Sequence, residues 1–131
     1  MYKKIIIGII CVVLLSGAAL GGRYLYQTWK YKKIISEIVI ANPDLSKLKD
    51  GVYNGSFDAI LVAVDVSVTI ENKKIKEIKI DRHKNERGSK ALNIISKVVS
   101  AQSLEVDTVS GATNSSKVIL KAIENALDSG N

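Results

Sequence analysis

The stretch Val62-Ala63-Val64-Asp65-Val66-Ser67-Val68-Thr69-Ile70 decides the fold of this chain. Every second residue in it is valine or isoleucine, and the residues between them are small or polar. This period of two is typical of a β-strand with one buried face and one exposed face. The sequence therefore predicts a strand over Val62–Ile70 whose aliphatic side chains all share the buried face.

The residues that follow this strand carry the signals of a hairpin. Glu71-Asn72-Lys73-Lys74 is polar, and asparagine tolerates the positive φ that tight turns require. Ile75, Ile78 and Ile80 then mark a return strand. Because the step from Ile75 to Ile78 breaks the alternation, we expect a β-bulge at the start of this strand. The pattern predicts an antiparallel hairpin.

Two later segments carry apolar residues at helical spacing. They are Ala91, Leu92, Ile95, Val98 and Val99 in the first segment, and Val118, Ile119, Ala122, Ile123, Ala126 and Leu127 in the second, which we expect to run over residues 114–127. Residues 51–56 are expected to form a short first strand, residues 81–88 a polar link, and residues 102–106 a connector or short strand. Two amphipathic helices on one face of a small antiparallel sheet form an α+β domain.

The amino-terminal part of the chain has a different composition. Residues 5–22 form a run of 18 residues without a charge. At ~1.5 Å per helical residue the run measures about 27 Å, close to the thickness of one bilayer core. Tyr24, Tyr26 and Trp29 follow it and suit the membrane interface. We expect a retained transmembrane signal-anchor; the alternative is a signal peptide cleaved near residues 18–21.

Between the apolar run and the domain, residues 24–41 are loosely helical, and Asn42-Pro43 ends the pattern. The expected organisation is a transmembrane segment at residues 1–23, a helical stalk and linker at 24–49, and the α+β domain at 50–131. The α+β domain is thus expected to be preceded by an amino-terminal transmembrane helix and a helical stalk.

The net charge of +6 is unevenly distributed along the chain. Residues 1–43 contain six basic residues and one acid, whereas residues 44–131 contain thirteen basic and twelve acidic residues. The excess of positive charge therefore flanks the apolar run, as in membrane proteins, and does not form a footprint for a phosphate backbone. We expect a lipid bilayer as a partner and no nucleic acid.

The chain contains one cysteine, Cys11, and one histidine, His83. These are too few for a zinc site, an iron–sulfur cluster or a disulfide within one chain. No metal site is expected, and any electron transfer by this protein requires an organic cofactor.

The stretch Asp107-Thr108-Val109-Ser110-Gly111-Ala112-Thr113-Asn114-Ser115-Ser116 lies between the two helical segments. Small residues at 111 and 112 allow a bulky ligand to approach the backbone. Hydroxyls at 113, 115 and 116 stand where a helix begins, and free N–H groups and the helix dipole favour an anion such as phosphate there. The alternative is an ordinary N-cap by serine or threonine.

The pattern Asp107-x-x-Ser110-Gly111-Ala112-Thr113 resembles the flavinylation motif of the FMN-binding domain family, which includes covalent-flavin subunits of sodium-pumping NADH:quinone and ferredoxin:NAD oxidoreductases. The resemblance covers roughly residues 50–127. It implies that FMN is attached to Thr113 through a phosphoester. It also implies cofactor-binding roles for Asp107, Ser110, Gly111, Ala112, Ser115 and Ser116, with His83 and Glu86 as further candidates.

Two segments depart from the larger members of that family. Residues 57–61 replace a glycine-rich stretch, and Glu86-Arg87-Gly88 replaces a Glu-Thr-Pro-Gly connector. Both changes concern contacts to the isoalloxazine ring. The two aromatic residues of the domain, Tyr53 and Phe57, are available either to stack on that ring or to pack in the core.

The resemblance implies a membrane-anchored electron carrier rather than a stand-alone enzyme. A separate flavin transferase would load the FMN, and membrane redox partners would exchange electrons with it. The domain would lie on the extracytoplasmic side of the cell membrane, with a single pass. The alternatives are a binding or sensor domain that holds FMN or another phosphate ligand noncovalently, and a structural module without a cofactor.

Overall fold

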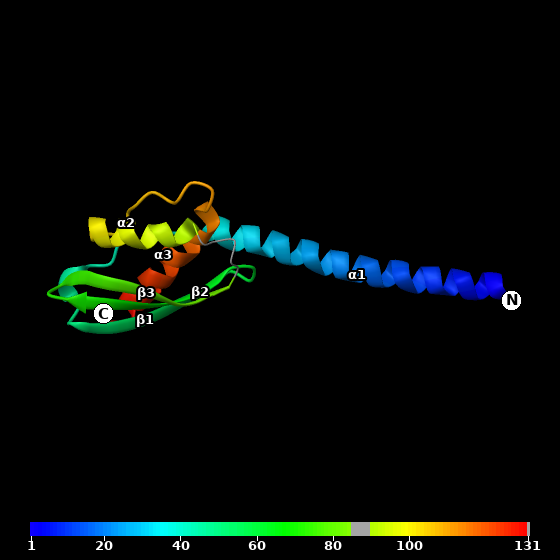
Figure 1. The fold of residues 1–131 in the computed structure, drawn as a ribbon, viewed down its shortest axis with the longest axis horizontal. Helices are drawn as coiled ribbons and strands as arrows, with labels where there is room; N and C mark the ends of the chain where they lie inside the picture. The colour runs from blue at the N-terminus through cyan, green and yellow to red at the C-terminus, as the bar shows by residue number, and fades with distance from the viewer. Residues whose placement is uncertain (85–89, 131) are drawn as a thin grey trace.

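A three-stranded antiparallel sheet in the order β1-β2-β3 forms the base of the domain. The computed structural model describes residues 1–84 and 90–130. The strands are β1 (Gly51–Asp58), β2 (Ala63–Glu71) and β3 (Lys74–Lys84), and the helices are α1 (Tyr2–Glu37), α2 (Asn93–Ala101) and α3 (Thr113–Asp128). Figure 1 shows α2 and α3 lying over one face of the sheet, while α1 projects away from the domain as a long rod. The expected α+β class with an amino-terminal apolar helix is confirmed.

The predicted hairpin is present as strands β2 and β3. Asn72 and Lys73 both adopt positive φ, at 53° and 62°, so the turn has the handedness that matches twisted strands. The register shifts between Thr69 and Ile70, where Ile75 pairs with Ile70, which confirms the predicted bulge. A second shift opposite Asp65 and Val66 was not predicted.

The return strand is longer than the sequence suggested. β3 continues to Lys84, and residues 82–84 pair with the start of β2, so the expectation of a polar link beginning at residue 81 was wrong. The error has a simple cause. The outer face of this sheet is solvated, and a charged strand end on such a face has the same composition as a loop.

The alternation along β2 has the expected consequence for burial. The five aliphatic side chains at 62, 64, 66, 68 and 70 are at most 2% exposed and face the helices. On the opposite face, Arg82 forms an ion pair with Asp65 at 2.7 Å, and Ser67 bonds to Asn54 at 2.8 Å. Tyr53 and Phe57 pack against the core from β1, so core packing accounts for both aromatic residues.

Helix α3 packs across β1 and β2 and approaches β1 very closely. A Cβ atom placed on Gly55 would lie 2.3 Å from the backbone nitrogen of Ala126 and 2.4 Å from the carbonyl oxygen of Ala122. Gly55 therefore allows the two backbones to touch. Nine of the sixteen α3 residues are buried in this packing.

Helix α2 covers the β3 side of the sheet. Its inward positions are Ile94 and Val98, both fully buried, whereas Leu92 is 40% exposed. The buried face of α2 therefore differs from the predicted one. Leu92 precedes the regular helix, and Ile94, which was not among the predicted apolar positions, is buried. Residues 102–106 form no strand.

Helix α1 is a single helix of 36 residues. It is the one helix among the described residues that is long and apolar enough to cross a membrane. It ends at Glu37, four residues earlier than the predicted end of the stalk at Ala41. Its last turns contact the domain, where Ile35 is 5% exposed and joins the core together with Leu48, which follows a short 3₁₀ turn at Leu45–Lys47.

The contact at Gly55 generates a prediction about stability. Gly55→Ala should destabilise the domain by about 3 kcal/mol or more, because the obstacle to the new methyl group is backbone and cannot rotate away. Denaturant unfolding monitored by circular dichroism measures the change. The control is the neighbouring exposed position, where Ser56→Ala should change stability by no more than about 0.5 kcal/mol. Equal stability of Gly55→Ala and the parent would contradict the close packing of α3 on β1.

Candidate functional site at the start of helix α3

The loop that leads into α3 is fixed by its apolar residues. Residues 102–112 return along α2 and reach α3 beside the last part of α1 (Figure 1). Val109 is half-buried against the core and Ala112 is 8% exposed. The amide of Ala112 donates to the carbonyl of Val109 at 2.9 Å, and Gly111 has φ +79°. A Cβ at Gly111 would meet open space, so glycine serves the backbone conformation at this turn.

Ser116 connects this loop to the first turn of α3. Its hydroxyl donates to the carbonyl of Ala112 at 2.7 Å and accepts from the amide of Val109 at 3.2 Å. The side chain is fully buried. From the sequence, Ser116 is one of the hydroxyls expected to bind phosphate, but in the structure it is buried and bonds to backbone groups of the loop.

Thr113 is the first residue of α3 and is exposed to solvent. The cap position before it is Ala112, which has no side chain able to cap the helix. The serine or threonine N-cap that the sequence offered as an alternative is therefore absent from this helix start. The first N–H groups of an α-helix lack partners within the helix, and the dipole there is positive. Thr113 thus presents a hydroxyl beside groups that favour an anion.

The other motif residues surround this position. Asp107, Ser110 and Gly111 are exposed, and Ser115 is half-buried. The main-chain carbonyl of Asp107 accepts a hydrogen bond from Lys97 of α2 at 3.3 Å. An open groove of about 520 Å³ lies between α2 and this part of the loop, with Lys97, Ser100, Ala101, Glu105, Val106 and Asp107 along its sides.

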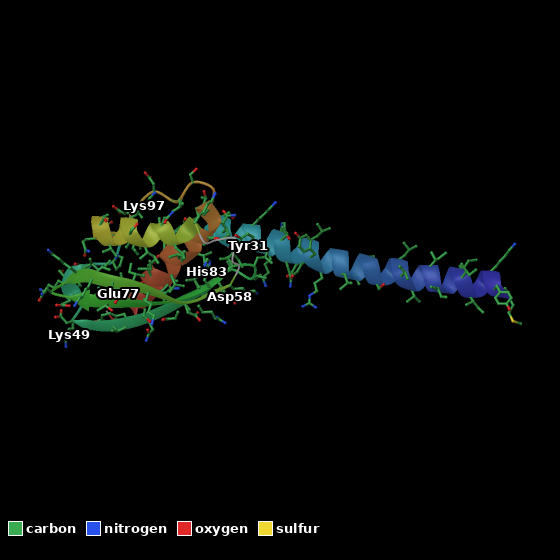
Figure 2. The ribbon with its side chains drawn as sticks, in the orientation of Figure 1. Tyr31, Lys49, Asp58, Glu77, His83 and Lys97 are labelled. Carbon is green, nitrogen blue, oxygen red and sulfur yellow. The ribbon has the colours of Figure 1, made fainter. Side chains whose placement is uncertain are left out.

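His83 comes to the same end of the domain from β3. It pairs with Val64, whose side chain is fully buried, so His83 points to the face of the sheet that the helices cover. Figure 2 shows it near Tyr31 and Asp58, at the end of the sheet nearest α1. Its Nε2 is buried and has no hydrogen-bond partner within residues 1–84 and 90–130. Glu86 lies outside the described residues.

The connection from β1 to β2 lies at this end too, and it contains a strained residue. Ile60 has φ +75°, which is a rare conformation for a β-branched residue. The carboxylate of Asp58 accepts from the Ile60 amide at 2.7 Å, and Lys84 donates to the Ile60 carbonyl at 2.9 Å. These residues belong to the segment 57–61, and they form a tight, hydrogen-bonded turn.

Helix α1 also contacts the start of α3. The side chain of Asn114, in the first turn of α3, lies beside the phenol of Tyr31. Burial raises the pKa of the Tyr31 hydroxyl above its ordinary value of 10, and Asn114 opposes that rise. The phenol is therefore neutral near pH 7, beside the first turn of α3.

These features define a class of protein: a small α+β domain with a helix start suited to a phosphorylated cofactor, joined to an apolar helix. The model of the FMN-binding domain family matches residues 62–128, which include β2, β3 and both domain helices. The chain belongs to this family, and its cofactor is FMN. The residues fit the phosphate end of FMN, because an exposed hydroxyl and uncapped helix amides occur together at Thr113.

One relative is an uncharacterized protein of Treponema pallidum. It is 34% identical over 85 residues, which cover 63% of this chain and 24% of that protein. The chain therefore spans about a quarter of the length of this relative. The similarity adds no function, because that protein is uncharacterized.

Three contributors to this region were missed by sequence reasoning. Val109 anchors the loop, Lys97 bonds to it, and Tyr31 reaches it from the stalk. An apolar residue within an otherwise polar loop was a usable signal for Val109. Tyr31 and Lys97 gave none, because their contacts depend on how separate helices pack.

The geometry of Ser116 generates a prediction. Ser116→Ala should lower the free energy of unfolding by about 1–3 kcal/mol, because the amide of Val109 loses its buried acceptor. The matched control is Ser115→Ala, which should change it by less than about 0.5 kcal/mol. Chemical unfolding measures both, and hydrogen exchange at Val109 should accelerate only in Ser116→Ala. Similar behaviour of the two variants would contradict the assigned role.

Proposed function

We propose that this protein is a membrane-anchored, extracytoplasmic electron carrier with FMN attached to Thr113 through a phosphoester. The observation that carries the proposal is the exposed Thr113 hydroxyl at the uncapped start of α3. When bound, FMN supplies the redox chemistry that the side chains lack. The chain contributes attachment, orientation and the electrostatic environment of the phosphate.

Attachment requires a separate enzyme, because a threonine hydroxyl is a weak nucleophile at its own pKa. A flavin transferase using Mg²⁺ and FAD would form the bond between Thr113 Oγ1 and the FMN phosphorus. The pyrophosphate bond of FAD breaks and AMP leaves. The hydroxyl proton passes to a base of the transferase. The exposure of Thr113 at the first position of α3 supports access by such an enzyme.

The neighbouring residues have supporting roles in this proposal. The amides at the start of α3 would contact the phosphate, and Ser110 and Gly111 would keep the approach free of large side chains. The Nε2 of His83 lies on the face covered by the helices, has no hydrogen-bond partner among residues 1–84 and 90–130, and would serve as a donor or acceptor toward the flavin. Asp107 is exposed and available to the transferase.

The membrane anchor is argued from α1. Its apolar residues are exposed, and Val12, Leu14, Leu15 and Leu20 are all more than 60% exposed. An exposed apolar surface of this length supports insertion into a lipid bilayer. An extracytoplasmic position of the domain follows the family resemblance, and membrane redox partners follow from the same source.

The rival functions are a noncovalent FMN or phosphate-ligand domain and a cofactor-free structural module. Both would leave Thr113 without a chemical modification. A yellow colour that survives denaturation separates the covalent carrier from both rivals, and a colour lost on denaturation identifies the noncovalent one.

The proposal predicts the position of the label. In full-length protein coexpressed with an active flavin transferase, the tryptic peptide containing residues 98–117 should gain one FMN moiety. Thr113→Ala should abolish the gain, because no acceptor hydroxyl remains, and should change stability by no more than about 0.5 kcal/mol since the residue is exposed. Peptide mass spectrometry and denaturant unfolding measure the two effects.

The controls are the other hydroxyls of the motif. Thr113→Ser should retain some label, and Ser110→Ala should retain most of it. Label on Thr113→Ala protein, or label mapped to Ser115 or Ser116, would overturn the assignment. An unlabelled parent in the presence of an active transferase would favour the noncovalent or structural function.

A second prediction concerns the anchor. Full-length protein should sediment with membranes and be released by detergent but not by salt, because the apolar run is long enough to cross a bilayer core. Fractionation followed by intact mass measurement tests this. A soluble product lacking the first 20 or so residues would instead identify a cleaved signal peptide.

A further inference from the structure

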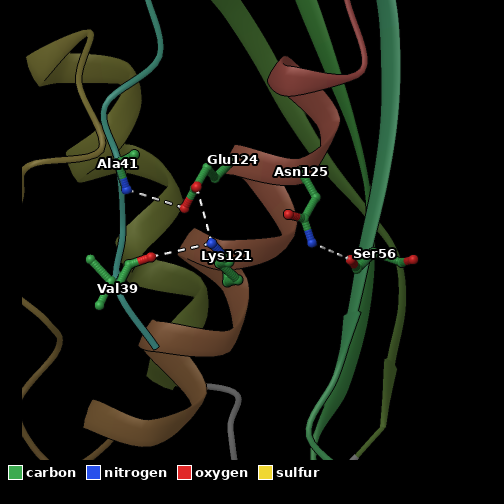
Figure 3. Close-up of polar contacts among 6 residues, drawn as sticks. All are labelled: Val39, Ala41, Ser56, Lys121, Glu124 and Asn125. Carbon is green, nitrogen blue, oxygen red and sulfur yellow. Dashed lines mark hydrogen bonds and ion pairs between the residues drawn. The ribbon is translucent and has the colours of Figure 1, made fainter. Parts of the chain in front are cut away.

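A polar cluster ties α3 to the segment that follows α1. Glu124 is 5% exposed, and its carboxylate accepts from the amide of Ala41 at 3.2 Å and from Lys121 at 3.0 Å. Lys121 also donates to the carbonyl of Val39 at 3.2 Å. Figure 3 shows these four residues, which we call the Glu124 cluster, on one side of α3. Asn125 points to the other side and donates to the carbonyl of Ser56 at 2.9 Å.

Next to the Glu124 cluster, α1 and the residues that follow it make an apolar contact with the domain. Ile35 is buried, and Tyr31, Ile34, Ile38 and Ile40 pack against the core. No glycine occurs between Gly22 and Gly51. The connection between α1 and the domain is therefore not a flexible linker. It lacks glycine, and both apolar contacts and hydrogen bonds hold it against the domain.

The packing determines which end of the domain is nearest α1. The start of α3 contacts α1 through Asn114 and Tyr31, and the turn between β2 and β3 lies at the far end (Figure 1). β3 has eleven residues, so this turn is about 33 Å from the near end.

The distance to the membrane can be estimated along α1. Tyr31 lies nine residues beyond Gly22, the last residue of the uncharged run. Nine residues of α-helix measure about 14 Å. The headgroup layer of one leaflet is about 5–8 Å thick. The start of α3 is therefore expected within about 10 Å of the headgroups, and the far turn several times higher.

The residues of α1 at this level suit a lipid surface. The exposed aromatic residues Tyr24, Tyr26 and Trp29 lie between Arg23 and the basic residues Lys30, Lys32 and Lys33. The ammonium of Lys33 lies 5.7 Å from the ring centroid of Trp29. Basic and aromatic side chains together favour the headgroup region.

We propose that the Glu124 cluster fixes the domain on α1 so that the Thr113 edge faces the membrane surface. The inference rests on the proposed function, because it places the FMN attachment site next to the bilayer. Electron exchange then takes place at the membrane surface, and the β2–β3 turn faces away from it. Glu124 and Lys121 are positioning residues that act through the segment after α1.

The orientation is tested in full-length protein reconstituted into lipid nanodiscs containing a headgroup-labelled acceptor lipid. In a Cys11→Ala background, a donor dye is attached at Ser110→Cys beside the attachment loop or at Lys74→Cys beside the far turn. Energy transfer to the lipid should be clearly stronger from Ser110→Cys. Equal transfer from the two positions, or stronger transfer from Lys74→Cys, would overturn the proposal.

The role of the cluster is tested by Glu124→Ala, which should reduce or remove the difference in transfer between the two dye positions. Lys121→Ala provides a second disruption at a less buried side chain, should Glu124→Ala fail to fold. Asn125→Ala is the matched control, because it removes a bond of α3 to β1 and should preserve the difference. A difference that persists in folded Glu124→Ala and Lys121→Ala would contradict the role of the cluster. The dyes report without flavin, so this test is independent of the mass measurement on Thr113.

Discussion

The contact between the backbone of α3 and Gly55 of β1 is the constraint on which the rest of the domain depends. Because no side chain separates the two backbones at Gly55, α3 lies directly against the sheet. The start of α3 lies at the end of the sheet where β1 and β3 finish (Figure 1). The loop before α3, His83 and the strained turn at Ile60 all lie at that end.

The buried Glu124 shows how the same helix serves two neighbours. A carboxylate that is 5% exposed is costly unless it is bonded, and here it is bonded to one ammonium and one amide. Lys121 and Glu124 both bond to the segment that follows α1, at Val39 and Ala41. Asn125 bonds instead to β1. α3 therefore connects the sheet on one side with the apolar helix on the other.

The sequence specified the elements better than it specified their contacts. The alternation over Val62–Ile70 predicted the central strand and its buried face, because a period of two is a local property that does not depend on partners. The end of β3 was missed, since charged residues on a solvated strand resemble a loop. The same limit applied to the site: the position of Thr113 followed from the motif, but the buried hydroxyl of Ser116 and the contact of Tyr31 with Asn114 depend on tertiary packing.

The unbroken course of α1 has a consequence for geometry. In an unbroken helix, each added residue turns everything beyond it by about 100° and moves it about 1.5 Å along the helix axis. In the proposed arrangement, the number of residues between the apolar run and Ile35 therefore sets the direction in which the Thr113 edge faces about the axis of α1. A single inserted residue in the stalk would turn that edge by about 100° while raising it by only about 1.5 Å. Under the proposed function, membrane partners would then be selected by the direction that this edge faces, a dependence that a flexible tether would remove.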